Sequence, residues 1–160
     1  MPKRRVLLVD DEVTILLTMK AVLEISGFDV DTAASAREGK SKIKLREYQM
    51  VITDMRMESD AAGREVIQAA RNAPYHPAVA LLTAYPEDDF GDLGADKILV
   101  KARQTAILLR EIEKLLDTHA AKLQRRLQRV LELWTSSQVR NPLAERQATA
   151  YTNPQAHKCG

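Results

Sequence analysis

The sequence predicts an α/β fold, a doubly wound five-stranded parallel sheet of the (βα)5 type with an elongated last helix. Three observations support this fold class. Five short apolar runs recur along the chain, segments of helical length separate most of them, and a long segment without Gly or Pro follows the last run. Strands that alternate with helices favour a parallel sheet covered by helices on both faces.

The elements follow one another in a regular order. The runs expected to form strands span 5–9, 28–33, 50–53, 78–83 and 97–100. The first helix is expected from an apolar stripe that ends before Gly27 and consists of Val13, Leu16, Leu17 and Leu23. The third helix has a similar stripe, which breaks at "NAPYHP" and consists of Val66, Ile67 and Ala70.

The second helix has a clear start. Ser35 is the expected N-cap, and the helix is expected to run through Ile43 and Leu45. Within it, "GKS" at 39–41 ends like a phosphate-binding loop, but Ala34 stands where that loop needs a glycine. A place on the helix is therefore the preferred interpretation of these three residues.

The longest expected element is a helix over 105–138, about 50 Å long at ~1.5 Å per residue. Part of it shows the alternating spacing of a coiled-coil seam, with Leu116, Ala120, Leu123, Leu127, Val130 and Trp134. The basic residues beside the seam are Lys122, Arg125, Arg126 and Arg129. Self-association as a homodimer is the preferred interpretation. Folding back onto the chain's own domain, or binding of nucleic acid or an anionic membrane surface by the basic flank, stays open.

Composition and charge bound the possibilities further. The chain has 160 residues, 45% of them hydrophobic, and one cysteine, Cys159, which has no internal partner. No apolar stretch approaches the ~20 residues of a membrane span. The start "MPKRR" is not followed by the long apolar region of a secretory signal. We therefore expect a cytoplasmic protein.

The charges divide the chain into two parts. Residues 1–118 carry a balance of −3 and residues 119–160 a balance of +5. An acidic body followed by a basic end suggests different roles for the two parts. We predict a main domain over 1–118, a helical extension over 119–137 and a flexible tail over 138–160, with at most a short helical turn around "LAERQ".

Carboxylates gather where two of the expected strands end. Asp10 and Asp11 follow the first run, and Asp54 ends the third. In a flavodoxin-like strand order these two strands are neighbours, and ligands bind at the carboxyl ends of such strands. Three carboxylates in one crevice repel one another unless a cation lies between them. Oxygen ligands at a shallow site suit Mg²⁺, so the sequence predicts a magnesium site.

Two further strand ends carry useful groups. Thr83 ends the fourth run with a hydroxyl, and Lys101 follows the fifth with a positive charge. Together with the three acids, these groups suit phosphoryl transfer onto a carboxylate, which depends mostly on positioning and electrostatics. Asp54 is the expected nucleophile. Lys101 would balance the added charge, and Thr83 would bind the phosphoryl group.

Over residues 4–118 the sequence resembles the receiver domain of two-component response regulators, of the stand-alone chemotaxis-regulator type. The motifs that carry the resemblance are "VLLVDDE", "VITDMRM", "LLTAY" and "ILVK". The resemblance implies that Asp54 accepts a phosphoryl group from the phosphohistidine of a sensor histidine kinase or phosphotransfer protein. It implies Mg²⁺ ligation by Asp11, Asp54 and the Arg56 backbone carbonyl, with Asp10 acting largely through water. The small Ala84 is implied to leave room for the phosphoryl group.

The sequence departs from the family pattern in four places. Ala102 stands where the family usually has proline after the lysine, so the resemblance does not fix the direction of the Lys101 side chain. Ile98 stands where an aromatic switch residue is usual, and Tyr85 is a possible substitute. The loop after Asp54 lacks the usual proline and is one residue longer. The segment between Thr83 and 94–96 is about one turn too short for a full fourth helix.

These departures leave a second hypothesis open, a protein-interaction module that kept the receiver fold and works without phosphorylation. A third, an aspartyl phosphatase of the haloacid dehalogenase type, is disfavoured. Those enzymes place two acids two positions apart on the first strand, whereas Asp10 and Asp11 are adjacent. We therefore expect a signalling protein that catalyses only its own phosphorylation and dephosphorylation.

Overall fold

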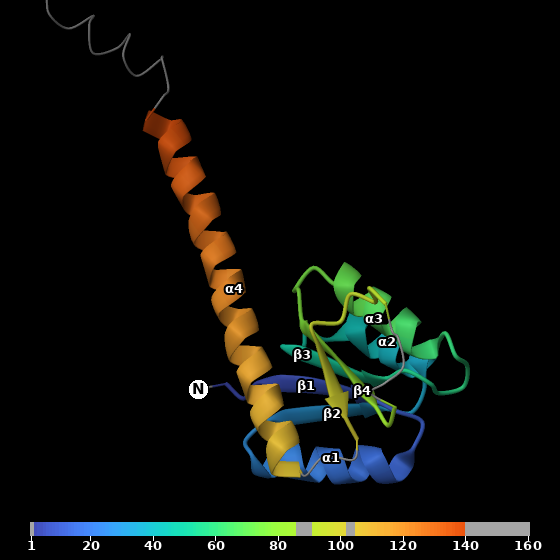
Figure 1. The fold of residues 1–160 in the computed structure, drawn as a ribbon. Helices are drawn as coiled ribbons and strands as arrows, with labels where there is room; N and C mark the ends of the chain where they lie inside the picture. Colours follow the sequence, from blue (N-terminus) through green and yellow to red (C-terminus); the bar gives the residue numbers. More distant parts are fainter. Residues whose placement is uncertain (1, 86–90, 102–104, 140–160) are drawn as a thin grey trace, which may run out of the picture. The chain divides into compact units, whose positions relative to one another are not determined.

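The structure is a computed structural model, which describes residues 2–85, 91–101 and 105–139 (Figure 1). The chain divides into two compact units, Met1–His119 and Ala120–Gly160. The first unit holds a sheet and its covering helices. The described part of the second unit is the continuation of the last helix. The short helical turn expected around "LAERQ" lies outside the described residues.

The sheet has five parallel strands in the order β2-β1-β3-β4-β5. Their bounds are β1 Arg5–Val9, β2 Asp29–Ala33, β3 Met50–Asp54, β4 Ala78–Thr83 and β5 Lys97–Val100. In the register, Val6 pairs with Val30 on one side and with Met50 on the other. β1 and β3 are therefore neighbours, and the predicted doubly wound, flavodoxin-like sheet is confirmed.

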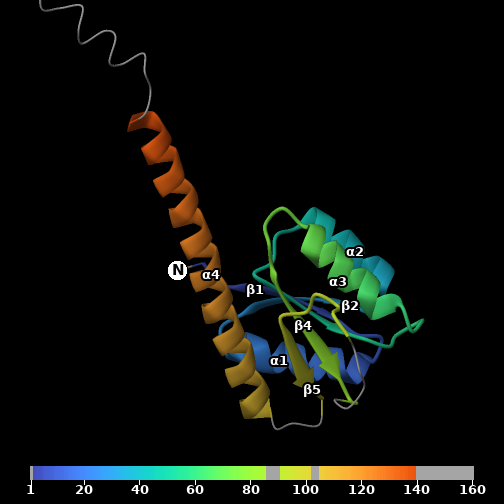
Figure 2. The ribbon, with the colours of Figure 1, turned by 45° about the horizontal axis from the view of Figure 1, so that its top comes forward.

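Within the described residues, four helices accompany the sheet, α1 Val13–Ile25, α2 Ala36–Leu45, α3 Ala62–Asn72 and α4 Thr105–Val139. Helices α2 and α3 cover one face, and α1 lies on the other (Figure 2). The first turns of α4 join α1, because Leu108 and Ile112 are buried in the same core. The predicted long last helix is confirmed.

Alternate residues of each strand supply two cores. On β1, Val6 and Leu8 pack toward α1 and α4, whereas Leu7 and Val9 pack toward α2 and α3. Side chains of a strand point to opposite faces in turn, so a strand covered on both faces is apolar throughout. This explains why the central strands read as continuous apolar runs.

The predicted stripe of α1 is wrong in part. Val13 and Leu17 are 61% and 63% exposed, and Met19 is buried in their place, beside Leu16 and Leu23. On a helix with ~3.6 residues per turn, Leu16, Met19 and Leu23 fall on one side. Val13 lies about a quarter of a turn, and Leu17 about a third of a turn, from the centre of that side. One face of the helix packs on the sheet, and that face holds Met19 rather than Val13 and Leu17.

Helix α2 begins as predicted. The Ser35 side chain accepts a hydrogen bond from the Glu38 backbone N–H at 3.1 Å, and the Glu38 carboxylate accepts one from the Ala34 backbone N–H at 2.9 Å. This reciprocal arrangement satisfies two donors of the helix start. The "GKS" residues lie inside α2, and Gly39 packs against Val9. Their placement on a helix is confirmed.

No helix occurs among the described residues between β4 and β5, which are 84–85 and 91–96. The complete alternation of five strands with five helices is therefore not observed in that part of the chain. The absence of a helix there agrees with the expected loss of a full fourth helix. Within the described ranges, no helix is both long and apolar enough to cross a membrane.

The predicted seam of the last helix is wrong at its first residue. Leu116 is 4% exposed and belongs to the core shared with α1. It lies one turn after Ile112, so it continues the stripe that holds α4 on the sheet. The seam that remains for a partner begins at Ala120, in the second unit.

Candidate functional site

The predicted site residues come together at the carboxyl ends of four strands. Asp10 follows β1, Asp54 is the last residue of β3, Thr83 is the last residue of β4, and Lys101 follows β5. Carboxyl ends of parallel strands meet at one edge of the sheet, and the order β1-β3-β4-β5 makes these strands consecutive neighbours. Residues that lie far apart in the sequence therefore share one site.

The three aspartates form a compact acidic cluster. Carboxylate oxygens of Asp10, Asp11 and Asp54 lie within 4.8 Å of one another. Asp10 and Asp54 are buried, whereas Asp11 is exposed. This donor set of carboxylate oxygens could bind a divalent metal ion, since three negative charges this close need a cation between them.

The two adjacent aspartates have different structural roles. The backbone N–H of Glu12 donates to Asp10 Oδ1 at 2.9 Å, so Asp10 forms the turn that leads from β1 into α1. The backbone N–H of Asp10 donates to the Ala33 carbonyl at 3.1 Å, which ties this turn to β2. Asp10 is thereby held in place, and Asp11 projects from the turn toward solvent.

Lys101 lies between the buried acids. Its Nζ is 2.7 Å from Asp10 Oδ2, 3.3 Å from Asp54 Oδ2 and 3.8 Å from a carboxylate oxygen of Glu12. The ammonium group is the charged partner of the buried Asp10 Oδ2.

Burial and charge act in opposite directions on these groups. Burial raises the pKa of Asp54; the Lys101 charge opposes that rise and the Asp10 charge adds to it, leaving the pKa above its usual value. For Lys101, burial alone would lower the pKa, but the hydrogen bond and charge of Asp10, together with those of Asp54, raise it. Lys101 therefore stays protonated among the carboxylates.

The backbone around Asp54 is fixed by its neighbours. The Met55 N–H donates to Asp54 Oδ1 at 2.8 Å, and the Thr53 hydroxyl donates to the Asp54 carbonyl at 2.9 Å. Gly63, in the first turn of α3, donates its N–H to the Met55 carbonyl at 3.1 Å. A Cβ at Gly63 would lie only 2.5 Å from the Asp54 carbonyl oxygen and 2.6 Å from Met55 Cα. The site thus depends on this glycine.

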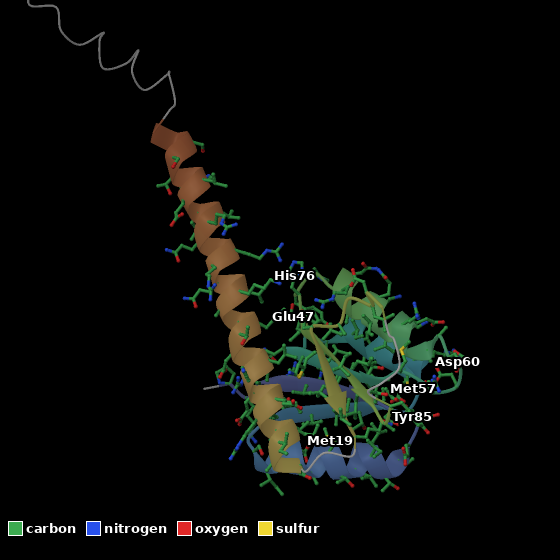
Figure 3. The ribbon with its side chains drawn as sticks, in the orientation of Figure 1. Met19, Glu47, Met57, Asp60, His76 and Tyr85 are labelled. Atoms are coloured by element: carbon green, nitrogen blue, oxygen red, sulfur yellow. The ribbon has the colours of Figure 1, made fainter. Side chains whose placement is uncertain are left out.

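The site opens into a pocket of about 260 Å³. It is lined by Asp11, Glu12, Asp54, Met55, Arg56, Thr83, Ala84, Tyr85 and Lys101. The buried Thr83 accepts at Oγ1 a hydrogen bond from the Tyr85 N–H at 3.0 Å. Tyr85 is exposed, and the Arg56 guanidinium lies 5.8 Å from the centre of its ring. In Figure 3, Tyr85 and Met57 lie at this end of the sheet, away from His76 and Glu47.

The departures from the family pattern have visible consequences here. Ile98 is 43% exposed and is not enclosed by the core, and Tyr85 points toward solvent beside Arg56. Ala102 lies outside the described residues. Lys101 reaches both buried acids all the same, because its backbone N–H donates to the Thr83 carbonyl at 2.8 Å.

Sequence reasoning assigned no role to two residues of the site. Glu12 lines the pocket and is the third acid near Lys101. Its place directly after Asp11 was the available signal. Gly63 had no such signal, because a glycine near a helix start is common and its contact with Asp54 spans two elements.

Residues 6–113 match the response regulator receiver domain family. This match covers more than half of the chain. The chain belongs to this family. It therefore contains a receiver domain of two-component signalling, a module that generally signals rather than acting as an enzyme.

Solved receiver domains share its fold. The response regulator TrrA of Thermotoga maritima, solved in complex with Mg²⁺ and BeF, is 32% identical, with a TM-score of 0.63 over 70% of this chain and 98% of that one. A CheY-like receiver domain protein of Methanospirillum hungatei is 27% identical, with a TM-score of 0.68 over 76% of this chain and 99% of that one.

Curated relatives are longer regulators. The acid tolerance regulatory protein ActR of Rhizobium meliloti is 34% identical over 52% of this chain and 43% of its own length. A CpxR homolog of Haemophilus influenzae, a transcriptional regulatory protein, is 33% identical over 73% of this chain and 52% of its own length. The receiver chain thus spans about half the length of these relatives.

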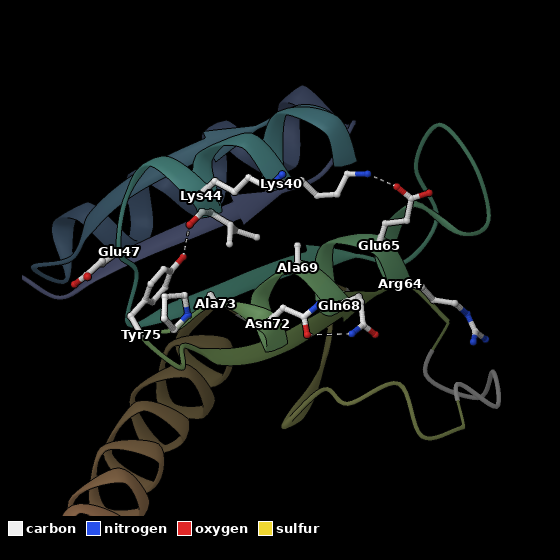
Figure 4. A pocket seen from close by; sticks show the side chains of 12 residues that line it. Lys40, Lys44, Glu47, Arg64, Glu65, Gln68, Ala69, Asn72, Ala73 and Tyr75 are labelled. Carbon is white, nitrogen blue, oxygen red and sulfur yellow. Dashed lines mark hydrogen bonds and ion pairs between the residues drawn. The ribbon is translucent and has the colours of Figure 1, made fainter.

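A larger hollow of about 960 Å³ lies between α2 and α3 of the receiver domain (Figure 4). Lys40 of α2 forms an ion pair with Glu65 of α3, and the Tyr75 hydroxyl donates to the Ile43 carbonyl at 2.8 Å. None of its lining residues belongs to the acidic site. Both signs of charge line it, so it favours no class of ligand.

Proposed function

We propose that Asp54 accepts a phosphoryl group from the phosphohistidine of a sensor kinase or phosphotransfer protein, and that the modified protein signals through altered self-association or partner binding. The observation that carries the proposal is the acidic cluster with Lys101 at its centre. Three carboxylates, a buried hydroxyl and a protonated lysine at one sheet edge are the parts that phosphoryl transfer onto a carboxylate requires.

Each residue has a distinct part in this step. An Asp54 carboxylate oxygen attacks phosphorus, the P–N bond of the phosphohistidine breaks, and its electron pair returns to the imidazole nitrogen, which takes up a proton. Lys101, 3.3 Å from Asp54 Oδ2, balances the charge that the phosphoryl oxygens bring. The Thr83 hydroxyl binds the new group, and the small Ala84 leaves room at the pocket mouth.

Mg²⁺ is the proposed cofactor. Asp11, Asp54 and the Arg56 carbonyl would hold it directly, with Asp10 acting through water. The bound ion supplies positive charge that neutralises phosphoryl oxygens. The acidic donor set fits this ion, and the related TrrA was solved with Mg²⁺ and BeF. We further propose a cytoplasmic location.

Incubation with acetyl phosphate and Mg²⁺ tests the acceptor role. We expect the intact mass of the full chain to rise by one phosphoryl group, and peptide mapping to place that group on Asp54. Omission of Mg²⁺ with added EDTA is expected to prevent the gain. A chain that gains nothing with Mg²⁺ present would exclude the acceptor role and favour the phosphorylation-independent module.

Magnesium addition is also expected to stabilise the protein. A ligand that binds only the folded state raises stability, by about 2.7 kcal/mol at a hundredfold excess over its dissociation constant. We expect the melting temperature to rise with Mg²⁺ and to return to its starting value with EDTA. Asp11→Asn should remove most of this rise, whereas Asp60→Asn, outside the acidic cluster, should keep it. An equal rise in both variants would place the ion elsewhere.

A further inference from the structure

The described part of the second unit exposes a group of large apolar side chains. These are Leu127, Val130, Leu131, Leu133 and Trp134, each between 56% and 67% exposed. They occur within eight consecutive residues of one helix. Four of them, Leu127, Val130, Leu131 and Trp134, lie on one side of the helix and mark a contact surface. Leu133 lies on the side that carries the basic residues.

Helical geometry sorts this segment into separate faces. At ~3.6 residues per turn, six apolar residues fall within an arc of about 100°. They are Ala120, Leu123, Leu127, Val130, Leu131 and Trp134. Four basic residues fall within a second arc of similar width, whose centre lies about 140° from the first. They are Lys122, Arg125, Arg126 and Arg129.

The spacing of the apolar residues discriminates between possible occupants. A helix on an anionic membrane carries basic residues on its polar face and needs a broad apolar face. The alternation by three and four from Ala120 to Trp134 instead gives the narrow stripe of a coiled-coil seam, with the basic residues off that stripe. Two copies of the helix, by contrast, can join their apolar faces while most of their positive charges remain in solvent.

We propose that the helix over 120–134 pairs with the same segment of a second copy of this chain, in parallel and in register. Ala120, Leu127 and Trp134 then occupy one set of seam positions, and Leu123 and Val130 the other. Each seam residue packs against its own counterpart.

The flanks of the seam determine the direction. One flank carries Arg126 and Leu133, and the other carries Gln124 and Leu131. In a parallel pair, each flank faces the opposite flank of the partner, so Arg126 meets uncharged residues. In an antiparallel pair centred on Leu127, the two Arg126 flanks face each other and their like charges repel. Parallel pairing avoids this repulsion.

The inference deepens the proposed function and rests on it for the signalling role of the pair, though not for the pairing itself. A parallel pair would join two receiver domains by the same end of their last helix. Phosphoryl acceptance by Asp54 and pairing of the helices are measured by separate experiments, so either can fail alone.

Cysteine cross-linking in the full chain tests the pairing without any phosphoryl donor. Cys159→Ser first removes the native thiol. In that background, Val130→Cys and Leu123→Cys are each expected to form a disulfide dimer with themselves under mild oxidation. Ser136→Cys, on the basic side of the helix, is the matched control and should cross-link at least about tenfold less.

Each alternative gives a different result. Preferential cross-linking between Leu123→Cys and Val130→Cys chains in a mixture would indicate antiparallel pairing and overturn the proposal. A monomer in sedimentation that binds vesicles of anionic phospholipid would identify a membrane surface instead. Leu127→Asp is expected to weaken the dimer about 100-fold or more, because it places an unpaired charge in the seam. Gln128→Asp, off the seam, should change it far less.

Discussion

Asp54→Asn is expected to lower phosphoryl uptake from acetyl phosphate by at least about 1,000-fold, the scale on which loss of a nucleophile acts. Asparagine has nearly the same shape, but its amide oxygen is not a nucleophile of comparable strength. Because burial already raises the pKa of Asp54, a neutral side chain at this position costs the fold little. Intact mass after incubation with Mg²⁺ measures the uptake.

The control for this variant is Asp60→Asn. Asp60 is an exposed aspartate of the loop between β3 and α3, outside the acidic cluster. The Asp60→Asn variant should gain one phosphoryl group at the wild-type rate. Circular dichroism should show both variants folded. If Asp54→Asn gains a phosphoryl group as readily as the wild type, another side chain is the acceptor.

Gly63→Ala is expected to cause the largest loss of stability among single methyl additions near the site. The added Cβ would meet backbone atoms at 2.5 Å, 2.6 Å and 2.7 Å, all of them in Asp54 and Met55. Backbone in a buried strand end cannot move aside without shifting the site. We expect a loss of about 3 kcal/mol in the free energy of unfolding, at the upper end for overpacking. Phosphoryl uptake should slow in the surviving folded fraction.

Gly39→Ala is the matched control, since both glycines lie in helices and pack on the sheet. Its Cβ would meet two methyl groups of Val9, at 3.0 Å and 3.1 Å, and a side chain can adjust by this amount. Alanine also favours the helix by roughly 1 kcal/mol over glycine. Urea unfolding should therefore place Gly39→Ala within about 1 kcal/mol of the wild type. Equal losses of unfolding free energy in both variants would show that contact with the Asp54 backbone does not cause the loss in Gly63→Ala.

The strand order and the strand ends could be predicted because their signals are local. A buried strand is a continuous apolar run, and the polar residue that ends it is visible in the sequence, as with Asp54 and Thr83. Topology then follows from general rules for parallel sheets. These two kinds of information suffice to place four distant residues in one crevice, without knowledge of any side-chain contact.

Helix faces were less predictable than strands. Val13 and Leu17 fit an apolar stripe as well as Met19 does, and only the packing of α1 on β1 shows which set is buried. Leu116 fits both the seam and the core, and the position of α4 on the sheet decides between them. Where a helix carries more apolar residues than one face can bury, periodicity alone does not show which of them are buried.

The order of the elements, the sheet topology and the five chemical groups at its edge were predictable from residue type and from spacing along the chain. The tertiary structure decided what each group contacts: Lys101 joins Asp10 and Asp54, Glu12 stands beside it, and Gly63 touches the Asp54 backbone. These contacts depend on distances between elements that are remote in sequence. Such distances are set by how the helices pack on the sheet, which no local pattern records.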